Sequence, residues 1–137
     1  MLVRAHHFTK KRLVNSTEKF WIDVSSYHNV NELYWVADIL ISDYSSAIFD
    51  YGLLGKPIIC YGYDYEKYEA DNGFLMDLKN EFPSGIKKTE KEVICFIQSM
   101  DYNKESLRCK QYIDRYVTHP GNATKECIDA IYEKILR

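Results

Sequence analysis

The sequence lacks the features that mark most membrane, secreted and nucleic-acid-binding proteins. No apolar run approaches the roughly 18 residues that a membrane span needs, and the first residues, MLVRAHHF, do not have the layout of a secretory signal. The net charge of -2 gives no reason to expect a nucleic-acid partner. Hydrophobic residues make up 46% and charged residues 28% of the 137 residues. These values are typical of one globular domain of ordinary size.

Paired cysteines are absent as well. The four cysteines are far apart and form no CxxC motif: Cys60, Cys95, Cys109 and Cys127. Three of them lie in apolar or helical patterns, where a thiol acts as a small hydrophobic group. We therefore expect reduced thiols and a cytoplasmic protein.

The chain has no polar lead-in before its first strand pattern. Residues 2–8, LVRAHHF, already form a strand pattern, and domains rarely open with a core strand. We therefore expect the chain to be a piece of a longer protein or an excised segment.

What is present is an alternation of strand and helix patterns. Strands are expected at residues 2–8, 20–25, 38–42 and 57–63. Helices are expected at residues 29–37, 45–55 and 89–100, and at about 103–117 and 122–136. The segment between 66 and 74 is rich in turn residues. Because the strands are continuous apolar runs, the pattern predicts an α/β fold with a doubly wound, mostly parallel, Rossmann-like sheet, in a single domain of residues 1–137.

The turn after residues 38–42 carries two adjacent serines, Ser45 and Ser46, and no glycine. It is therefore neither a Walker loop nor a GxGxxG turn. Ligands of such sheets bind beyond the carboxyl ends of the strands, where a helix N-terminus also favours anions. The two hydroxyls can donate to phosphate oxygens, but a serine that simply caps the helix fits the pattern too. Asp43 is interpreted as an acceptor for backbone amides that fixes this turn.

Asp50 favours a ligand site over a simple cap, because it lies one helical turn after Ser46 and projects on nearly the same side. It is followed by Gly55 and Pro57 in the string DYGLLGKP. This arrangement resembles the GT-B glycosyltransferases, in which an acidic residue at this place holds the ribose of a sugar nucleotide. The resemblance implies a fold equivalent to the C-terminal half of a GT-B enzyme, with phosphate at the two serines and ribose at Asp50.

A narrower resemblance rests on a longer string, SDYSSAIFDYGLLGKPIICYGYDYEKY. DVSSYHNVNELYWVADIL stands before it, and GFLMDL and FPSGIKKTEKE follow it. Together these segments resemble the CDP-glycerol glycerophosphotransferase family, which polymerises the poly(glycerol phosphate) or poly(ribitol phosphate) chains of teichoic acids. The resemblance covers roughly residues 2–127 and corresponds to the C-terminal, donor-binding half of a family member.

The resemblance implies a role for several residues. His6 would be catalytic and face the donor pyrophosphate, with Arg4 supporting it from the same face of the strand. Ser45 and Ser46 would bind the β- and α-phosphates. The cytosine would lie at a turn made of Val24, Ser25, Ser26 and Tyr27. CDP-glycerol would be the substrate, and neither a cofactor nor a metal ion is expected.

Several neighbouring residues have simpler interpretations. His7 points to the face opposite His6, so a chelating histidine pair is not expected. Asp64, Glu66 and Tyr68 fit either a surface turn or a loop on the donor side. Both alternatives stay open from the sequence.

The sequence also departs from the family pattern. Members often carry an Asp-Gly-Lys-Ala string late in the domain, but residues 120–126 read PGNATKE, with Pro120 and Asn122 in place of the acidic and basic residues. A phosphate contact from this loop is therefore in doubt. The general-base histidine expected in the acceptor half is not in this sequence.

The partners expected are CDP-glycerol or another CDP-alditol, and an N-terminal acceptor domain or partner chain. Contact with the inner face of the cell membrane is left open. Without an acceptor half, the isolated chain is expected to be inactive. Two other functions also fit: a non-catalytic CDP-binding module or remnant, and the donor half of a UDP-sugar glycosyltransferase.

Overall fold

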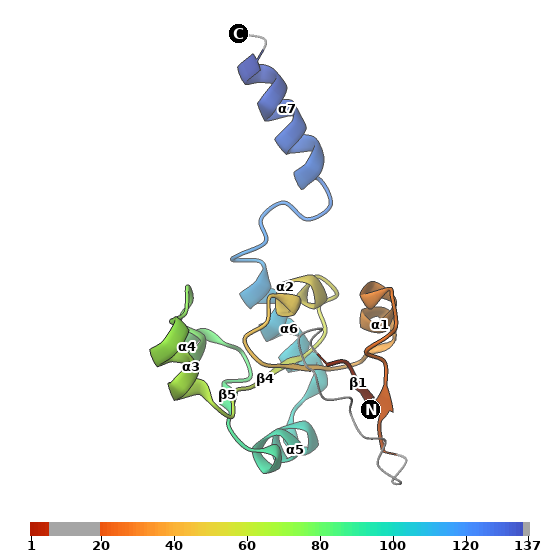
Figure 1. The fold of residues 1–137 in the computed structure, drawn as a ribbon, viewed down its shortest axis with the longest axis vertical. Helices are drawn as coiled ribbons and strands as arrows, with labels where there is room; N and C mark the ends of the chain where they lie inside the picture. The colour runs from red at the N-terminus through yellow and green to blue at the C-terminus, as the bar shows by residue number, and fades with distance from the viewer. Residues whose placement is uncertain (6–19, 136–137) are drawn as a thin grey trace. The chain divides into compact units, whose positions relative to one another are not determined.

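The computed structural model describes residues 1–5 and 20–135. Its backbone contacts divide the chain into two compact units, Met1–Tyr34 (unit 1) and Trp35–Arg137 (unit 2). Figure 1 shows the elements along the chain from red to blue. The single domain expected from the sequence stays a prediction.

Unit 1 contains two short parallel strands, β1 (Leu2–Val3) and β2 (Ile22–Asp23). The ladder is extended by a bond of 2.9 Å from the Val24 amide to the carbonyl of β1's last residue. Helix α1 (Val30–Val36) follows, and its last two residues belong to unit 2. The Asn29 side chain accepts from the backbone amide two residues later at 3.1 Å at the start of this helix.

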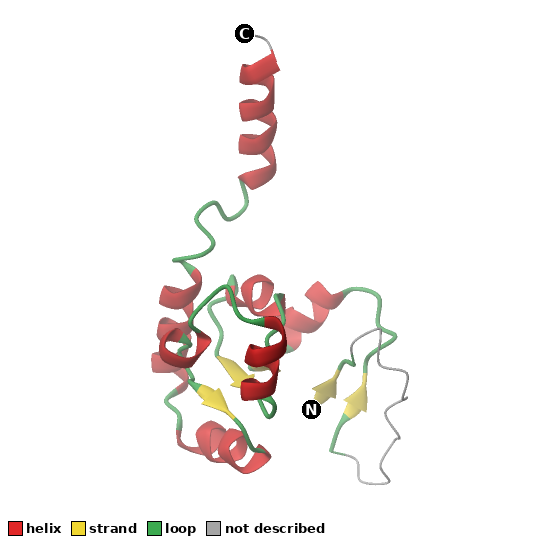
Figure 2. Ribbon diagram, turned by 60° about the vertical axis from the view of Figure 1, so that its left-hand side comes forward, coloured by secondary structure: helices red, strands yellow, loops and turns green. Residues whose placement is uncertain are grey.

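Unit 2 is built on a three-stranded parallel sheet in the order β3-β4-β5. The strands are β3 (Leu40–Ser42), β4 (Ile58–Tyr61) and β5 (Ile86–Lys87). The helices of this unit are α2 (Ala47–Gly52), α3 (Tyr65–Asn72), α4 (Leu78–Glu81), α5 (Glu90–Ser99), α6 (Tyr102–Ile113) and α7 (Ala123–Ile135). Figure 2 shows the strands in yellow with helices around them. All described strand pairs are parallel, which confirms the predicted α/β fold class.

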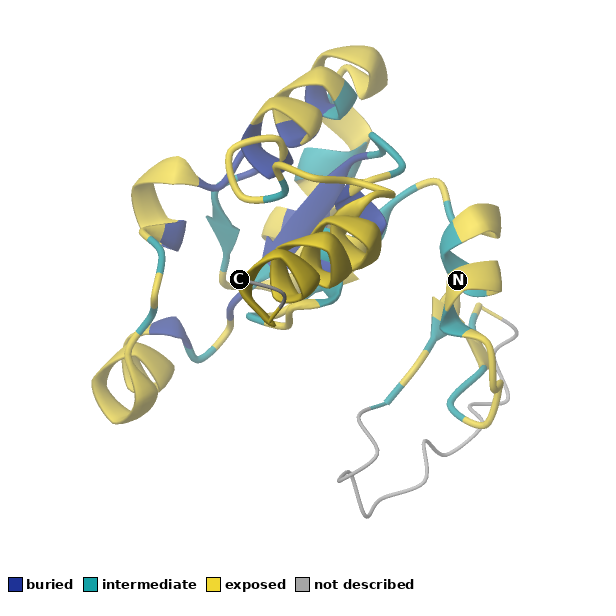
Figure 3. Cartoon of the chain, turned by 90° about the horizontal axis from the view of Figure 1, so that it is seen from above, coloured by how far each residue is buried: buried dark blue, intermediate teal, exposed yellow. Residues whose placement is uncertain are grey.

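The core of unit 2 surrounds the central strand β4. Ile58, Ile59 and Cys60 are each at most 2% exposed, and β4 is dark blue in Figure 3. Burying a side chain of this size stabilises the fold by roughly 1.5–3 kcal/mol. Around them lie Tyr51 of α2 and Ile113 of α6, both fully buried. The continuous apolar run PIIC is therefore explained by burial of the middle strand.

Close packing of α2 against α6 requires a glycine. A Cβ placed on Gly52 would lie 2.3 Å from Cγ1 of Ile113, which is far inside van der Waals contact. A glycine is favoured at position 55 for a different reason. Gly55 has a φ of +65°, the left-handed conformation, in the turn that follows α2. The predicted stop of this helix at Gly55 is thus correct to within a few residues.

Helix α5 begins with a capping box, which Thr89 and, three residues later, Glu92 indicate in the sequence. The Thr89 hydroxyl accepts from the Glu92 amide at 3.2 Å, and the Glu92 carboxylate accepts from the Lys88 amide at 2.7 Å. The carboxylate thus reaches the residue just before the cap. Both bonds satisfy amides that have no partner inside the helix.

Two elements differ from the sequence-based expectation. Residues 65–72 form helix α3, although this segment was expected to be turn-rich. Only Tyr65 of α3 is buried, so the helix has no apolar stripe that periodicity could detect. The short strand β5 was not expected either. Its two residues pair with Cys60 and Tyr61 of β4, and two residues are too few to show an apolar run.

The two C-terminal helices lie close to their expected places. Helix α6 ends at Ile113, earlier than about 117, and residues 114–116 form a turn. Helix α7 has no buried residue. Within residues 1–5 and 20–135, none of the helices combines the length and the apolar character that crossing a bilayer requires.

Candidate functional site

The turn between β3 and α2, residues 43–46, is fixed by its own side chains. The Asp43 carboxylate accepts from the Ser45 amide at 3.2 Å, as interpreted from the sequence. The Ser45 hydroxyl in turn accepts from the Ala47 amide at 3.2 Å. Ser46 occupies the N-cap position of α2, but its side chain makes no cap hydrogen bond to the helix. The two serines therefore differ: Ser45 shapes the turn and Ser46 is not used as a cap.

Both serines and Asp50 are exposed. Asp50 lies in the first turn of α2, one helical turn after the cap residue Ser46. Hydroxyl and carboxylate groups at this place are able to bind polar ligand atoms without first giving up buried contacts. The structure thus brings together the three residues of unit 2 that the resemblance implies.

The lysine of the GKP string has a structural role. The Lys56 ammonium donates to the carbonyls of Trp35 and Ala37 at 2.8 and 2.7 Å. A cation at the C-terminal end of a helix is favourable because the carbonyl oxygens there carry partial negative charge. Lys56 therefore fixes the segment that leads into β3.

Behind the turn, the buried strand β4 supplies further contacts. The Cys60 thiol lies 3.9 Å from the Asp43 carbonyl, and the Cys60 amide donates to the Ser84 hydroxyl at 3.2 Å. Burial, with a smaller contribution from the Asp43 carboxylate, raises the pKa of the Cys60 thiol to about 11. The thiol is therefore protonated at neutral pH and is not a nucleophile. None of the four cysteines forms a disulfide.

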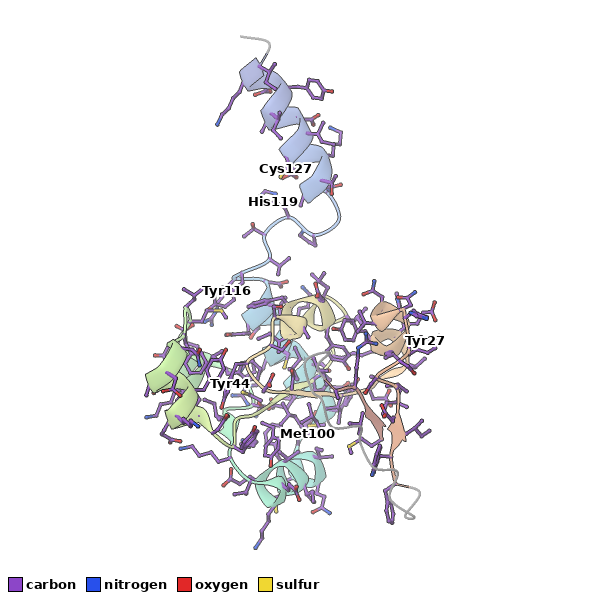
Figure 4. All side chains as sticks on the ribbon, in the orientation of Figure 1. Tyr27, Tyr44, Met100, Tyr116, His119 and Cys127 are labelled. Carbon is purple, nitrogen blue, oxygen red and sulfur yellow. The ribbon has the colours of Figure 1, made fainter. Side chains whose placement is uncertain are left out.

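Sequence reasoning missed Tyr44, which lies inside the turn. Its hydroxyl donates to the Asp64 carboxylate at 3.1 Å, and its ring contacts those of Tyr65, Tyr68 and Phe74. Figure 4 labels Tyr44 near α3. The signal in the sequence that could have indicated this cluster is the high density of tyrosines between residues 61 and 68. A search for helical or strand periodicity does not detect such a signal.

Asp64 is the N-cap residue of helix α3, and Glu66 and Tyr68 lie within this helix, so the segment does not form the surface turn that the sequence allowed. Asp64 binds Tyr44, Glu66 forms an ion pair with Lys88, and Tyr68 stacks on Phe74. The contact with Lys88, together with a hydrogen bond, lowers the pKa of Glu66. These contacts hold α3 in place next to the turn.

In unit 1, the predicted cytosine-side turn borders a hollow of about 470 Å³. Its lining residues are Asp23, Val24, Ser26, Tyr27, His28, Asn29 and Glu32. Ser25 is not among them, and its hydroxyl accepts from the Ala5 amide at 2.9 Å. The Tyr27 hydroxyl donates to the Glu32 carboxylate, and this bond raises the pKa of Tyr27.

Arg4 braces the same turn. Its guanidinium donates to the Tyr27 carbonyl at 2.6 Å. This contact gives Arg4 a structural role in unit 1, and its predicted role at a donor phosphate stays a prediction. His6 and His7 lie outside the described residues. Within residues 1–5 and 20–135, no cluster of His, Cys, Asp and Glu side chains is arranged to hold a metal ion.

Comparison with protein families finds a match over nearly the whole chain. The matching family is described as CDP-Glycerol:Poly(glycerophosphate) glycerophosphotransferase, and the match covers residues 1–133.

Relatives of known name are similar but much longer. The chain is 37% identical over 102 residues to a teichoic acid glycerol-phosphate transferase of Staphylococcus aureus (strain NCTC 8325 / PS 47), covering 74% of this chain and 26% of that protein. It is 36% identical over 117 residues to a teichoic acid poly(ribitol-phosphate) polymerase of Bacillus spizizenii, covering 82% of this chain and 18% of that protein. The chain thus spans about a quarter of the first relative and less of the second.

Comparison with solved structures also finds proteins of teichoic acid synthesis that are longer than this chain. The wall teichoic acid polymerase TagF matches with a TM-score of 0.70 and 30% identity, over 98% of this chain and 34% of the other. A histidine-to-asparagine variant of TagF soaked with CDPG matches with a TM-score of 0.72 and 32% identity, over 98% and 35%.

Proposed function

Since the chain belongs to the CDP-glycerol:poly(glycerophosphate) glycerophosphotransferase family, we propose that it is the donor-binding part of a transferase. This enzyme would move glycerol phosphate from CDP-glycerol to a growing teichoic acid chain. The observation that carries the proposal is the family match over residues 1–133, within which Ser45 and Ser46 lie exposed at the end of β3. The relatives' names and the TagF variant soaked with CDPG support the same chemistry.

In the proposal, the turn of residues 43–46 binds the diphosphate of the donor. Ser45 and Ser46 donate hydrogen bonds to phosphate oxygens, and bonds to charged acceptors are stronger than neutral ones. Asp50, one helical turn later, accepts from the two hydroxyls of the ribose. The exposure of all three side chains supports this assignment.

The cytosine is assigned separately to the turn of Val24 to Tyr27 in unit 1. The hollow beside this turn supports the assignment, because three of its lining residues belong to the predicted set. Ser25 contributes by holding the turn to Ala5 rather than by lining the hollow.

The proposed reaction is a phosphoryl transfer. A terminal hydroxyl of the acceptor attacks the β-phosphorus of CDP-glycerol, the bond from this phosphorus to the bridging oxygen breaks, and CMP leaves. The proton of the hydroxyl goes to a general base that we place in an acceptor-binding part outside residues 1–137, on the same or another chain. Such chemistry depends on in-line placement and charge stabilisation. His6 and Arg4 are proposed to stabilise the charge that develops on CMP.

Calorimetric titration of the chain with CDP, UDP and ADP tests the proposal. We expect CDP to bind and UDP and ADP to bind less well, with no turnover of CDP-glycerol by this chain alone. The variant Ser45→Ala/Ser46→Ala should bind CDP at least about tenfold to a hundredfold less tightly, because each lost hydrogen bond to a charged group contributes about 1.5–3 kcal/mol.

The matched control is Ser99→Ala, which removes an exposed hydroxyl from α5 and should leave the affinity for CDP unchanged. A preference for UDP would favour the glycosyltransferase alternative. Unchanged affinity in the double variant would refute the phosphate assignment.

A further inference from the structure

The hydroxyl of Tyr44 connects the turn of residues 43–46 to the start of α3. It donates to Oδ1 of Asp64 at 3.1 Å, across 20 residues of sequence. Asp64 is the N-cap residue of α3, but its side chain makes no cap hydrogen bond to that helix. Its carboxylate is therefore directed to the turn rather than to its own helix.

The ring of Tyr44 is enclosed by aromatic neighbours. Its centroid lies 4.5 Å from that of Tyr68, 5.0 Å from that of Phe74 and 6.0 Å from that of Tyr65. Tyr68 and Tyr65 also stack on Phe74, with interplanar angles of 20° and 18°. Contacts of this kind each contribute about 0.5–1.5 kcal/mol beyond the buried area.

Gly62 completes the enclosure. A Cβ at this position would lie 2.8 Å from the Tyr44 hydroxyl and 2.8 Å from Cγ2 of Ile86. Both distances are too short, so any other residue at position 62 would force the side chains of Tyr44 and Ile86 to shift. The position of the Tyr44 hydroxyl therefore depends on its bond to Asp64 and on the absence of a side chain at residue 62.

The residues on either side of Tyr44 are held as well. The Asp43 carbonyl lies 3.9 Å from the Cys60 thiol, and the Asp43 carboxylate accepts from the Ser45 amide. The turn therefore has consecutive anchors at positions 43, 44 and 45. Ser46, next in the chain, is exposed and makes no cap bond among the described residues.

Burial and the Asp64 carboxylate raise the pKa of the Tyr44 phenol far above its ordinary value. The hydroxyl therefore keeps its proton at neutral pH and remains a donor.

We propose that the Tyr44–Asp64 hydrogen bond is a positioning device that holds the Ser45–Ser46 turn in the conformation that receives the donor diphosphate. The inference rests on the proposed function of this turn. Tyr44 acts through the backbone of its neighbours, and holding the turn before the ligand arrives removes the cost of ordering it on binding. The alternative is that Tyr44 only fills space among the aromatic rings.

The variant Tyr44→Phe separates these two roles because it keeps the ring and removes the hydroxyl. The matched control is Tyr65→Phe, which removes a hydroxyl that donates to Glu69 in the same aromatic cluster. For each variant, the affinities for CDP and for cytidine and the thermal unfolding midpoint are measured. We expect Tyr44→Phe to bind CDP about tenfold less tightly, equal to about 1.4 kcal/mol, with unchanged affinity for cytidine. Tyr65→Phe should leave both affinities unchanged.

Two further variants test the partner. Asp64→Ala should reproduce the loss seen in Tyr44→Phe, and the double variant Tyr44→Phe/Asp64→Ala should be no worse than either single variant, because both remove one bond. Asp64→Asn keeps an oxygen acceptor and should lose less. Full additivity of the two single effects would overturn the inference.

A measurement without ligand keeps the inference distinct from the proposed function. Hydrogen exchange of the Ser45 amide should become about tenfold faster in Tyr44→Phe and stay unchanged in Tyr65→Phe. Faster exchange without any binding of CDP to the parent chain would refute the proposed function but leave the turn-holding bond in place. Equal exchange in both variants, with unchanged affinity for CDP, would show that Tyr44 is packing alone.

Discussion

Two of the strand-to-helix turns of this chain, residues 43–46 and residues 24–29, are held by different means. Residues 43–46 of unit 2 are anchored through Tyr44 to an aromatic cluster and lie next to the buried strand β4. The turn of residues 24–29 in unit 1 is held by polar contacts of Arg4, Ser25 and Glu32, and most of its residues are exposed.

In the proposed function, this difference would suit the two turns to two kinds of recognition. Phosphate binding needs hydroxyls and amides in fixed directions, which a turn supported by a packed core provides. A nucleobase offers a flat face and polar edges, and a turn held by local hydrogen bonds presents backbone groups to it at less cost in buried area. Changes to the groups around each turn should lower stability by different amounts, and they are given from the largest expected effect to the smallest.

The largest effect is expected from Ile59→Ala in β4. Ile59 is fully buried in the middle strand, so its loss should lower the free energy of unfolding by about 2–5 kcal/mol. Urea unfolding measures this value. The control Ile94→Ala removes a side chain that is 54% exposed on α5 and should change stability by less than about 0.5 kcal/mol. Equal effects of the two variants would mean that the buried strand β4 contributes no more to stability than the exposed face of α5.

A smaller effect is expected at alkaline pH. The pKa of Cys60 is raised from 9.0 to about 11 by burial and by the Asp43 carboxylate. Between these values the unfolded chain has lost the thiol proton while the folded chain keeps it. The unfolded state then binds fewer protons, so stability falls as pH rises. The loss should be on the order of 2 kcal/mol by about pH 11.

Urea unfolding at a series of pH values from about 8 to 11 measures this slope. The buried tyrosines Tyr51 and Tyr112, whose pKa values are also raised, act in the same direction at higher pH. Cys60→Ala should give a shallower slope, and Cys95→Ala, at an exposed position, should keep the parent slope. The same slope in all three proteins would contradict the role of Cys60.

The smallest effect is expected from Ser25→Ala in unit 1. The Ala5 amide loses the acceptor it has at 2.9 Å, which should cost about 1 kcal/mol locally. Hydrogen exchange of the Ala5 amide should become about fivefold faster, with little change in global unfolding. Ser26→Ala, at an exposed residue lining the hollow, should leave this amide unchanged. If Ser25→Ala also lowers global stability by several kcal/mol, this turn is not held locally.

Local signals in the sequence were reliable where the chain interacts with its near neighbours. The capping box of Thr89 and Glu92, the stop at Gly55 and the amide bound by Asp43 all join residues a few positions apart. Apolar runs also located β3 and β4 correctly, because burial of a parallel strand leaves a mark on consecutive residues.

Other features depend on residues far apart in the chain. Helix α3 has one buried residue and is stabilised by contacts with Tyr44 and Lys88, so its own eight residues do not reveal it. Strand β5 exists because β4 offers a free edge for pairing. The roles of Ser46 and Asp50 at a ligand were inferred from family resemblance and stay predictions.

The sequence by itself determined the α/β class, the parallel strands, the glycine-free serine turn and the family, because these depend on local patterns and on motifs with fixed spacing. Only the tertiary structure decided that Tyr44 anchors this turn. Its bond to Asp64 spans 20 residues and needs the space left by Gly62. A contact of this kind exists only after the sheet has formed, because the sheet brings the ends of β3 and β4 to the same edge.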